Sequence, residues 1–145
     1  MIAPEHSIFS HLRKDARISL AVISQEEKIP LSTVYDQINR LQKNKIIHRF
    51  TALLDFSKLG YHYHAKLALK VPKEQKAALF HFLRTHSSLN TLSEINSGFD
   101  FFAETVHHDI KGYLALIEEL KEHFNLLQLQ EYQVIEEIEK EKFLQ

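Results

Sequence analysis

One stretch, Ile18 to Phe50, limits the fold more than any other, because it combines two short helical patterns with a break and the start of a strand pattern. A helix that begins near Ser32 carries apolar residues at the spacing i, i+4, i+7, namely Val34, Ile38 and Leu41. A shorter helix before it begins near Ser19, a suitable N-cap, and has its own apolar residues, Leu20, Ile23 and Ile29. The break at 28–30 and a strand pattern at 46–54 then predict a winged helix-turn-helix, a unit whose second helix enters the major groove of DNA.

The same spacing also fits two amphipathic helices of an ordinary hydrophobic core, because helix pairs are common and the pattern is short. The chemistry of the polar residues off the apolar stripe favours DNA, since these side chains can hydrogen-bond or pair with phosphate. They are Ser32, Thr33, Tyr35, Gln37, Asn39 and Arg40.

Composition excludes several classes of protein. The 145 residues, 44% hydrophobic and 26% charged, are typical of a globular chain with one domain or two small ones. Without cysteine there is no disulfide, thiolate zinc site or cysteine nucleophile, and the three glycines form no phosphate-binding loop. No apolar run is long enough to span a bilayer and the first residues do not resemble a signal peptide, so we expect a cytoplasmic protein.

The charge is unevenly distributed, although the net charge is only −1. Residues 1–50 carry eight Lys or Arg against five Asp or Glu, whereas residues 51–145 carry ten against fourteen. A positive first part and a negative second part suit a nucleic-acid-binding module joined to a domain with another task.

After residue 60 the hydrophobic period changes to two. Strand patterns cover 61–71, 91–95, 99–106 and 126–135, and helical patterns cover 73–86 and 109–124. This order, β-α-β-β-α-β, predicts a ferredoxin-like domain and an α+β chain with three parts: 1–54 winged helix-turn-helix, 55–60 hinge and 61–145 dimerisation domain. Apolar residues on both faces of the 99–106 strand predict a dimer that packs sheet on sheet.

The whole arrangement resembles the Lrp/AsnC family of transcription regulators. Three stretches carry the resemblance: DARISLAVIS (15–24), LSTVYDQINRLQKNKIIHRFTALLDFSKLG (31–60) and INSGFDFFAETV (95–106). The resemblance implies a RAM-type second domain, a homodimer or octamer, double-stranded DNA as partner, and an amino-acid effector bound at the subunit interfaces.

Carried over to this sequence, the resemblance implies two sets of site residues. The DNA-binding set is Lys28, Ser32, Thr33, Tyr35, Gln37, Arg40, Lys43 and Arg49. The effector-binding set is Ser97, Gly98, Phe99 and Asp100, where the family usually has Gly-x-Tyr-Asp.

The sequence also departs from the family pattern at the DNA-binding end. Lys28 stands where the family usually has a glycine in the turn, and Pro30-Leu31 replaces the usual Ser-Pro, which moves the expected N-cap to Ser32. Asp36-Gln37 occupies positions that usually hold arginines, so Asp36 would face phosphate or base edges at an electrostatic cost unless it accepts a hydrogen bond from a cytosine amino group.

Parts of the sequence also fit two other function classes. The ten histidines, including His62 and His64 on one strand face, suggest a metal site, but no cysteine and no H-E-x-x-H motif completes one, so we expect neither metal nor cofactor. Some tetrapyrrole-modifying decarboxylases share this two-domain build. No nucleophile, base and orienting group occur together, so we do not expect an enzyme. A protein that oligomerises with other regulators and has lost DNA binding is the remaining alternative.

Overall fold

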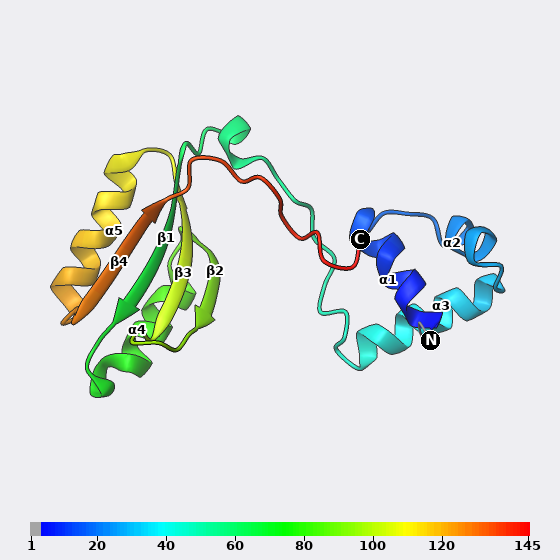
Figure 1. Ribbon diagram of the computed structural model, residues 1–145, viewed down its shortest axis with the longest axis horizontal. Coiled ribbons are helices and arrows are strands. Elements are labelled where there is room, and N and C mark those ends of the chain that lie inside the picture. The colour runs from blue at the N-terminus through cyan, green and yellow to red at the C-terminus, as the bar shows by residue number, and fades with distance from the viewer. Residues whose placement is uncertain (1–3) are drawn as a thin grey trace. The chain divides into compact units, whose positions relative to one another are not determined.

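A computed structural model describes residues 4–145, which divide into two compact units (Figure 1). Of these residues, one unit comprises 4–53 together with Ile138–Gln145, and the other comprises Leu54–Glu137. The C-terminal tail therefore belongs with the first unit, whereas the division predicted from the sequence extends the second domain to residue 145.

The first unit contains three helices, α1 (Pro4–Lys14), α2 (Leu20–Glu27) and α3 (Leu31–Lys43). One residue of α1, one of α2 and two of α3 form its buried core: Ile8, Ile23, Val34 and Ile38. Each such side chain stabilises the fold by roughly 1.5–3 kcal/mol relative to an exposed one. The apolar stripe predicted for the second helix of the helix-turn-helix thus packs against α1 and α2 in this core.

The segment predicted as the wing strand behaves differently. Residues 46–54 form no β-strand, although an extended, apolar sequence favours one. A strand needs a neighbouring edge to satisfy its N–H and C=O groups, and propensity alone does not supply that edge. The prediction of a strand at this place was therefore wrong for the single chain.

The second unit is a four-stranded antiparallel sheet with two helices. Its elements are η1 (Phe56–Leu59), β1 (Tyr63–Lys70), η2 (Lys73–Gln75), α4 (Lys76–Thr85), β2 (Leu89–Glu94), β3 (Phe101–His107), α5 (Ile110–His123) and β4 (Gln128–Gln133). The strand order β2-β3-β1-β4 places the first and third strands at the centre, which confirms the predicted ferredoxin-like arrangement.

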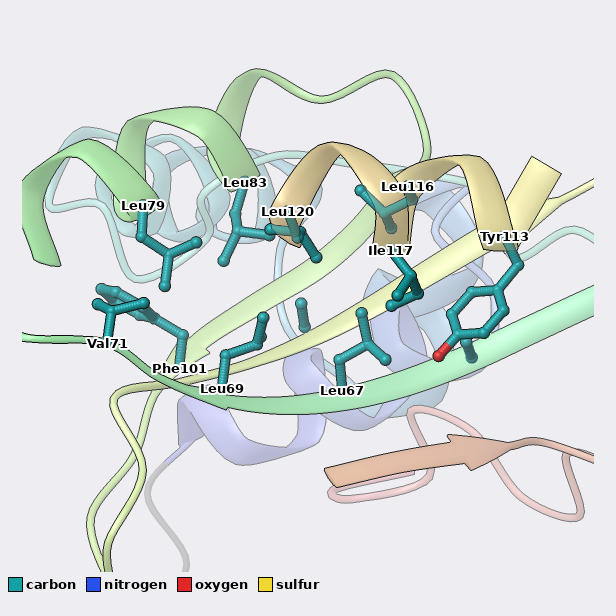
Figure 2. Packing of buried hydrophobic residues seen from close by; sticks show 12 residues of the cluster. Leu67, Leu69, Val71, Leu79, Leu83, Phe101, Tyr113, Leu116, Ile117 and Leu120 are labelled. Carbon is teal, nitrogen blue, oxygen red and sulfur yellow. The ribbon is translucent and has the colours of Figure 1, made fainter. Parts of the chain in front are cut away.

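The core of this unit lies between one face of the sheet and the helices, as Figure 2 shows. Alternate residues of β1 and β3 meet the inward residues of α4 and α5. The fully buried members are Leu67, Leu69, Leu79, Leu83, Ala103, Leu116 and Leu120. The alternate strand residues thus lie on the face of the sheet that packs against the apolar stripes predicted for the helices at 73–86 and 109–124.

The third strand begins two residues later than predicted. Gly98 has a φ of +94° and Ser97 a φ of +65°, so both lie in the left-handed region that a turn requires. The N–H of Asp100 donates to the Leu69 carbonyl oxygen (2.7 Å), while its own carbonyl accepts from the Ile95 N–H (3.1 Å). The second bond closes the turn between β2 and β3, and the first ties this turn to β1; the paired residues of β3 begin at Phe101.

Candidate nucleic-acid interface

The first helix of the helix-turn-helix begins at an ordinary N-cap. Ser19 has extended backbone angles, and its Oγ accepts a hydrogen bond from the Ala21 N–H at 3.2 Å. This bond satisfies one of the N–H groups that the first turn of a helix leaves unpaired. The sequence prediction for the start of this helix is confirmed.

The break between α2 and α3 is formed by Lys28 and Ser24. Lys28 is left-handed (φ 55°, ψ 43°), and its N–H donates to the Ser24 carbonyl. The Ser24 hydroxyl donates to the Ile29 carbonyl at 2.6 Å, which closes the turn from the other side. Lys28 therefore adopts the conformation for which a turn glycine is suited, with its side chain exposed.

The start of α3 corrects a sequence prediction. The N-cap is Pro30, whose carbonyl accepts from the Thr33 and Val34 N–H groups, and no side chain caps this helix end. Ser32 lies inside the first turn and is exposed. Because the ring of Pro30 fixes φ near its observed −59°, the chain enters the helix there, two residues earlier than a serine cap would place it.

The two faces of α3 differ in burial. Val34, Ile38 and Leu41 are 0%, 7% and 1% exposed. The opposite face is solvent-exposed and polar apart from Leu31 and Tyr35; its other residues are Ser32, Asp36, Asn39, Arg40 and Lys43. This division leaves one side of the helix for a partner and commits the other to the core.

A surface cavity of about 550 Å³ lies between the N-terminal ends of α2 and α3. Its lining residues are Ser19, Leu20, Ala21, Leu31, Ser32, Tyr35 and Asp36. Only Ser32 and Tyr35 belong to the predicted DNA-binding set. The contribution of α2 to this cavity could have been inferred from its place as the first helix of the motif, because that helix crosses the DNA backbone.

The predicted cations lie outside this cavity. Arg40 and Lys43 occupy the C-terminal half of α3, Lys28 lies in the turn before it, and Arg49 lies after it; all four are exposed. The base-facing end of a recognition helix is its N-terminal end, so these cations suit phosphate groups more than bases.

Two predicted contact residues lie closer to the interior. Thr33 is half-buried, and Gln37 is half-buried with its Oε1 fully covered. Within residues 4–145 that oxygen has no hydrogen-bond partner. The stripe spacing assigned Gln37 to the polar face, but its side chain lies at the edge of that face.

The four predicted effector residues lie together in the turn between β2 and β3. Ser97 and Gly98 are exposed, whereas Phe99 and Asp100 are half-buried. The Asp100 Oδ2 accepts a hydrogen bond from the Val71 N–H at 3.0 Å. One carboxylate oxygen is therefore engaged in holding the turn against the end of β1.

The histidines on the sheet do not form a metal site among the described residues. His64 lies on β1 and its Nε2 is buried, without a hydrogen-bond partner among the described residues. The described residues contain no group of three or more His, Asp or Glu that could hold a metal ion.

In residues 4–145, no helix has the length and apolarity needed to cross a membrane.

Comparison with known proteins agrees with this geometry. The family described as "Winged helix-turn-helix DNA-binding" matches residues 5–48. An uncharacterized HTH-type transcriptional regulator of Pyrococcus horikoshii is 27% identical over 107 residues, covering 74% of this chain and 68% of that protein.

Solved structures extend the similarity to both units. The AsnC family transcriptional regulator from Agrobacterium tumefaciens has a TM-score of 0.84 at 15% identity, covering 97% of this chain and 94% of that one. A transcriptional regulator from Neisseria meningitidis, solved as an L-Met complex, has a TM-score of 0.86 at 14% identity, covering 97% and 93%. The two-domain fold predicted from the sequence is thereby confirmed.

Proposed function

We propose that this chain, a DNA-binding transcription regulator with the two-domain fold of the Lrp/AsnC regulators, binds specific duplex sites as a homodimer with α3 in the major groove. The observation that carries the proposal is the two-sided character of α3. Its apolar stripe is committed to the core, and its exposed face presents polar side chains followed by Arg40 and Lys43. A helix of this kind at the second position of a helix-turn-helix is a recognition helix.

The direct test is fluorescence anisotropy with the full chain, its own upstream DNA and a random duplex, across a salt series. We expect tighter binding to the upstream DNA and affinity that falls as salt rises. Arg40→Ala should weaken binding to every sequence and reduce the slope of log K against log salt by about 0.9, the value of one phosphate contact. Lys121→Ala removes a cation from the exposed surface of α5 and serves as the control.

Two outcomes would contradict this assignment. If Arg40→Ala changes neither affinity nor slope, α3 is not the DNA-contacting helix. If the unmodified chain shows no affinity for DNA even at the lowest salt, the protein acts through its second unit as an oligomerisation partner.

The face of the sheet opposite α4 and α5 supports the homodimer. Phe102 and Val106 of β3 point away from the buried core residues and are half-buried, and Tyr132 of β4 is 53% exposed. Between them, the Lys66 Nζ and a Glu104 carboxylate oxygen form an ion pair at 3.1 Å. Apolar side chains around a paired charge suit association with a second copy.

The dimer is tested by light scattering after size exclusion. We expect a mass of at least twice 17.0 kDa, with higher multiples for an octamer. Phe102→Lys should shift the mass toward the monomer, whereas Leu114→Lys, on the outer side of α5, should leave it unchanged. A monomeric unmodified chain, or a dimer that is insensitive to Phe102→Lys, would refute this interface. In the dimer, two recognition helices about 34 Å apart would bind a pseudo-palindromic site.

An amino-acid effector is the remaining part of the proposal, and it rests on the neighbour solved with L-Met. The turn at Ser97–Asp100 is our proposed site, because exposed backbone of positive φ lies beside a carboxylate that has one oxygen left for an ammonium group. Calorimetric titration with L-methionine, followed by the other amino acids, tests it. Heat of binding that disappears in Asp100→Asn supports the site, and binding unaffected by that change refutes it.

A further inference from the structure

The base-facing end of α3 lacks a cation. Its exposed residues there are Leu31, Ser32, Tyr35 and Asp36, and Arg40 follows one turn after Asp36. In a protein that binds a polyanion, a carboxylate at this position weakens binding to any DNA, since it repels nearby phosphates. A base that donates a hydrogen bond to this carboxylate would offset the cost.

The Asp36 carboxylate is available for such a contact. It lines the cavity between the N-terminal ends of α2 and α3, and its residue is exposed. Within residues 4–145, no hydrogen bond or ion pair engages it. The neighbouring aspartates near the helix-turn-helix and hinge differ, because Asp15 and Asp55 accept hydrogen bonds from nearby backbone N–H groups. Asp36 therefore has no local structural role in this helix.

The chemistry of an ionised carboxylate limits which bases it can contact. It accepts hydrogen bonds and donates none. In the major groove guanine presents two acceptors and thymine one acceptor, so both repel it. Cytosine presents an N4 amino donor. Adenine presents an N6 amino donor beside the N7 acceptor, which repels the second carboxylate oxygen.

We propose that Asp36 determines sequence specificity by accepting a hydrogen bond from the N4 amino group of a cytosine in the major groove. The inference rests on the proposed function and names the base that this site selects. Leu31, which is 51% exposed in the same cavity, lies one turn before Tyr35 and suits a thymine methyl group beside that cytosine. The anionic end of α3 thus excludes guanine, while the cations of its other half contact phosphates.

The experiment selects binding sites from a randomised duplex library with the full-length chain and with Asp36→Asn. The two side chains have nearly the same shape, but asparagine combines a donor with an acceptor and matches adenine N6 and N7. We expect one position in each half-site to change from cytosine to adenine while the other positions stay the same. At that position, the unmodified chain should prefer cytosine over guanine by about 5- to 150-fold in anisotropy titrations.

Glu26→Gln is the matched control, because it removes one negative charge from the exposed part of α2 outside the cavity. Both variants should bind random DNA somewhat more tightly, but only Asp36→Asn should change the selected base. Identical selected sites for Asp36→Asn and the unmodified chain would overturn the inference while leaving the proposed function intact. Failure of the unmodified chain to bind any DNA would overturn both.

Discussion

Lys28 is a lysine in a backbone conformation that favours glycine, and replacing it gives a sharp test of how the helix-turn-helix is built. Its angles are φ 55° and ψ 43°, and its N–H caps α2 by donating to the Ser24 carbonyl. For a residue with a Cβ, the left-handed region costs roughly 1–2 kcal/mol. The surrounding turn imposes this cost, because the Ile29 N–H also donates to Ser24 (3.1 Å).

The expected gain from Lys28→Gly follows from this cost. Relief of the left-handed strain is partly offset, because glycine gives the unfolded chain extra freedom worth about 0.4–1 kcal/mol. The net increase in the free energy of unfolding should be about 0.5–1 kcal/mol. For a unit of roughly 60 residues, this raises the melting temperature by about 4–8 °C.

The assay is thermal unfolding of the full chain, combined with hydrogen exchange of the α2 and α3 amides. Lys28→Ala is the control, because it removes the same charge and keeps the Cβ. We expect Lys28→Gly to be more stable than Lys28→Ala, and both to show the same loss of DNA affinity if Lys28 contacts phosphate. Equal stability of the two variants, or lower stability of the glycine variant, would refute the argument from backbone strain.

Three further predictions concern single contacts. Arg13 donates to the tail carbonyls at 141 and 143 (2.9 Å each), so Arg13→Ala should expose the tail to carboxypeptidase; unchanged digestion would argue against this clamp. Asp100→Ala should lower the free energy of unfolding by about 1–3 kcal/mol in urea, because the Val71 N–H loses a charged acceptor. Burial lowers the pKa of His107, so the unfolded state binds protons more readily. The free energy of unfolding should therefore fall below about pH 6.5. This slope should flatten in His107→Gln and persist in His81→Gln, an exposed control.

The elements that repeat a pattern over many residues were predictable from the sequence. One buried face explains each of two patterns: the stripe of Val34, Ile38 and Leu41, and the alternation along β1. Burial of apolar side chains contributes most to the stability of these segments, so the sequence pattern follows it. The N-cap of α2 followed from a local rule that needs only Ser19 and its next two residues.

The features that were missed depend on competition between neighbours or on contacts remote in sequence. Pro30 is the N-cap of α3 in place of the predicted Ser32. Its ring fixes φ and its carbonyl accepts the first N–H groups of the helix, so the helix begins without a serine side chain as acceptor. The tail joined the first unit through the guanidinium of Arg13, more than a hundred residues earlier in the chain, and no periodic pattern records such a contact.

The segment 46–54 shows most clearly what strand propensity means. Among the described residues, 48–54 make no backbone hydrogen bond, and Phe50 and Leu53 are 46% and 55% exposed. Unpaired N–H and C=O groups beside exposed apolar side chains form an open strand edge, which a second extended segment can pair with. If the proposed second copy supplies that segment, the amides of 50–54 should gain protection from hydrogen exchange as protein concentration rises. Protection that is independent of concentration would mean that the strand pattern reflects only the sequence's preference for an extended backbone.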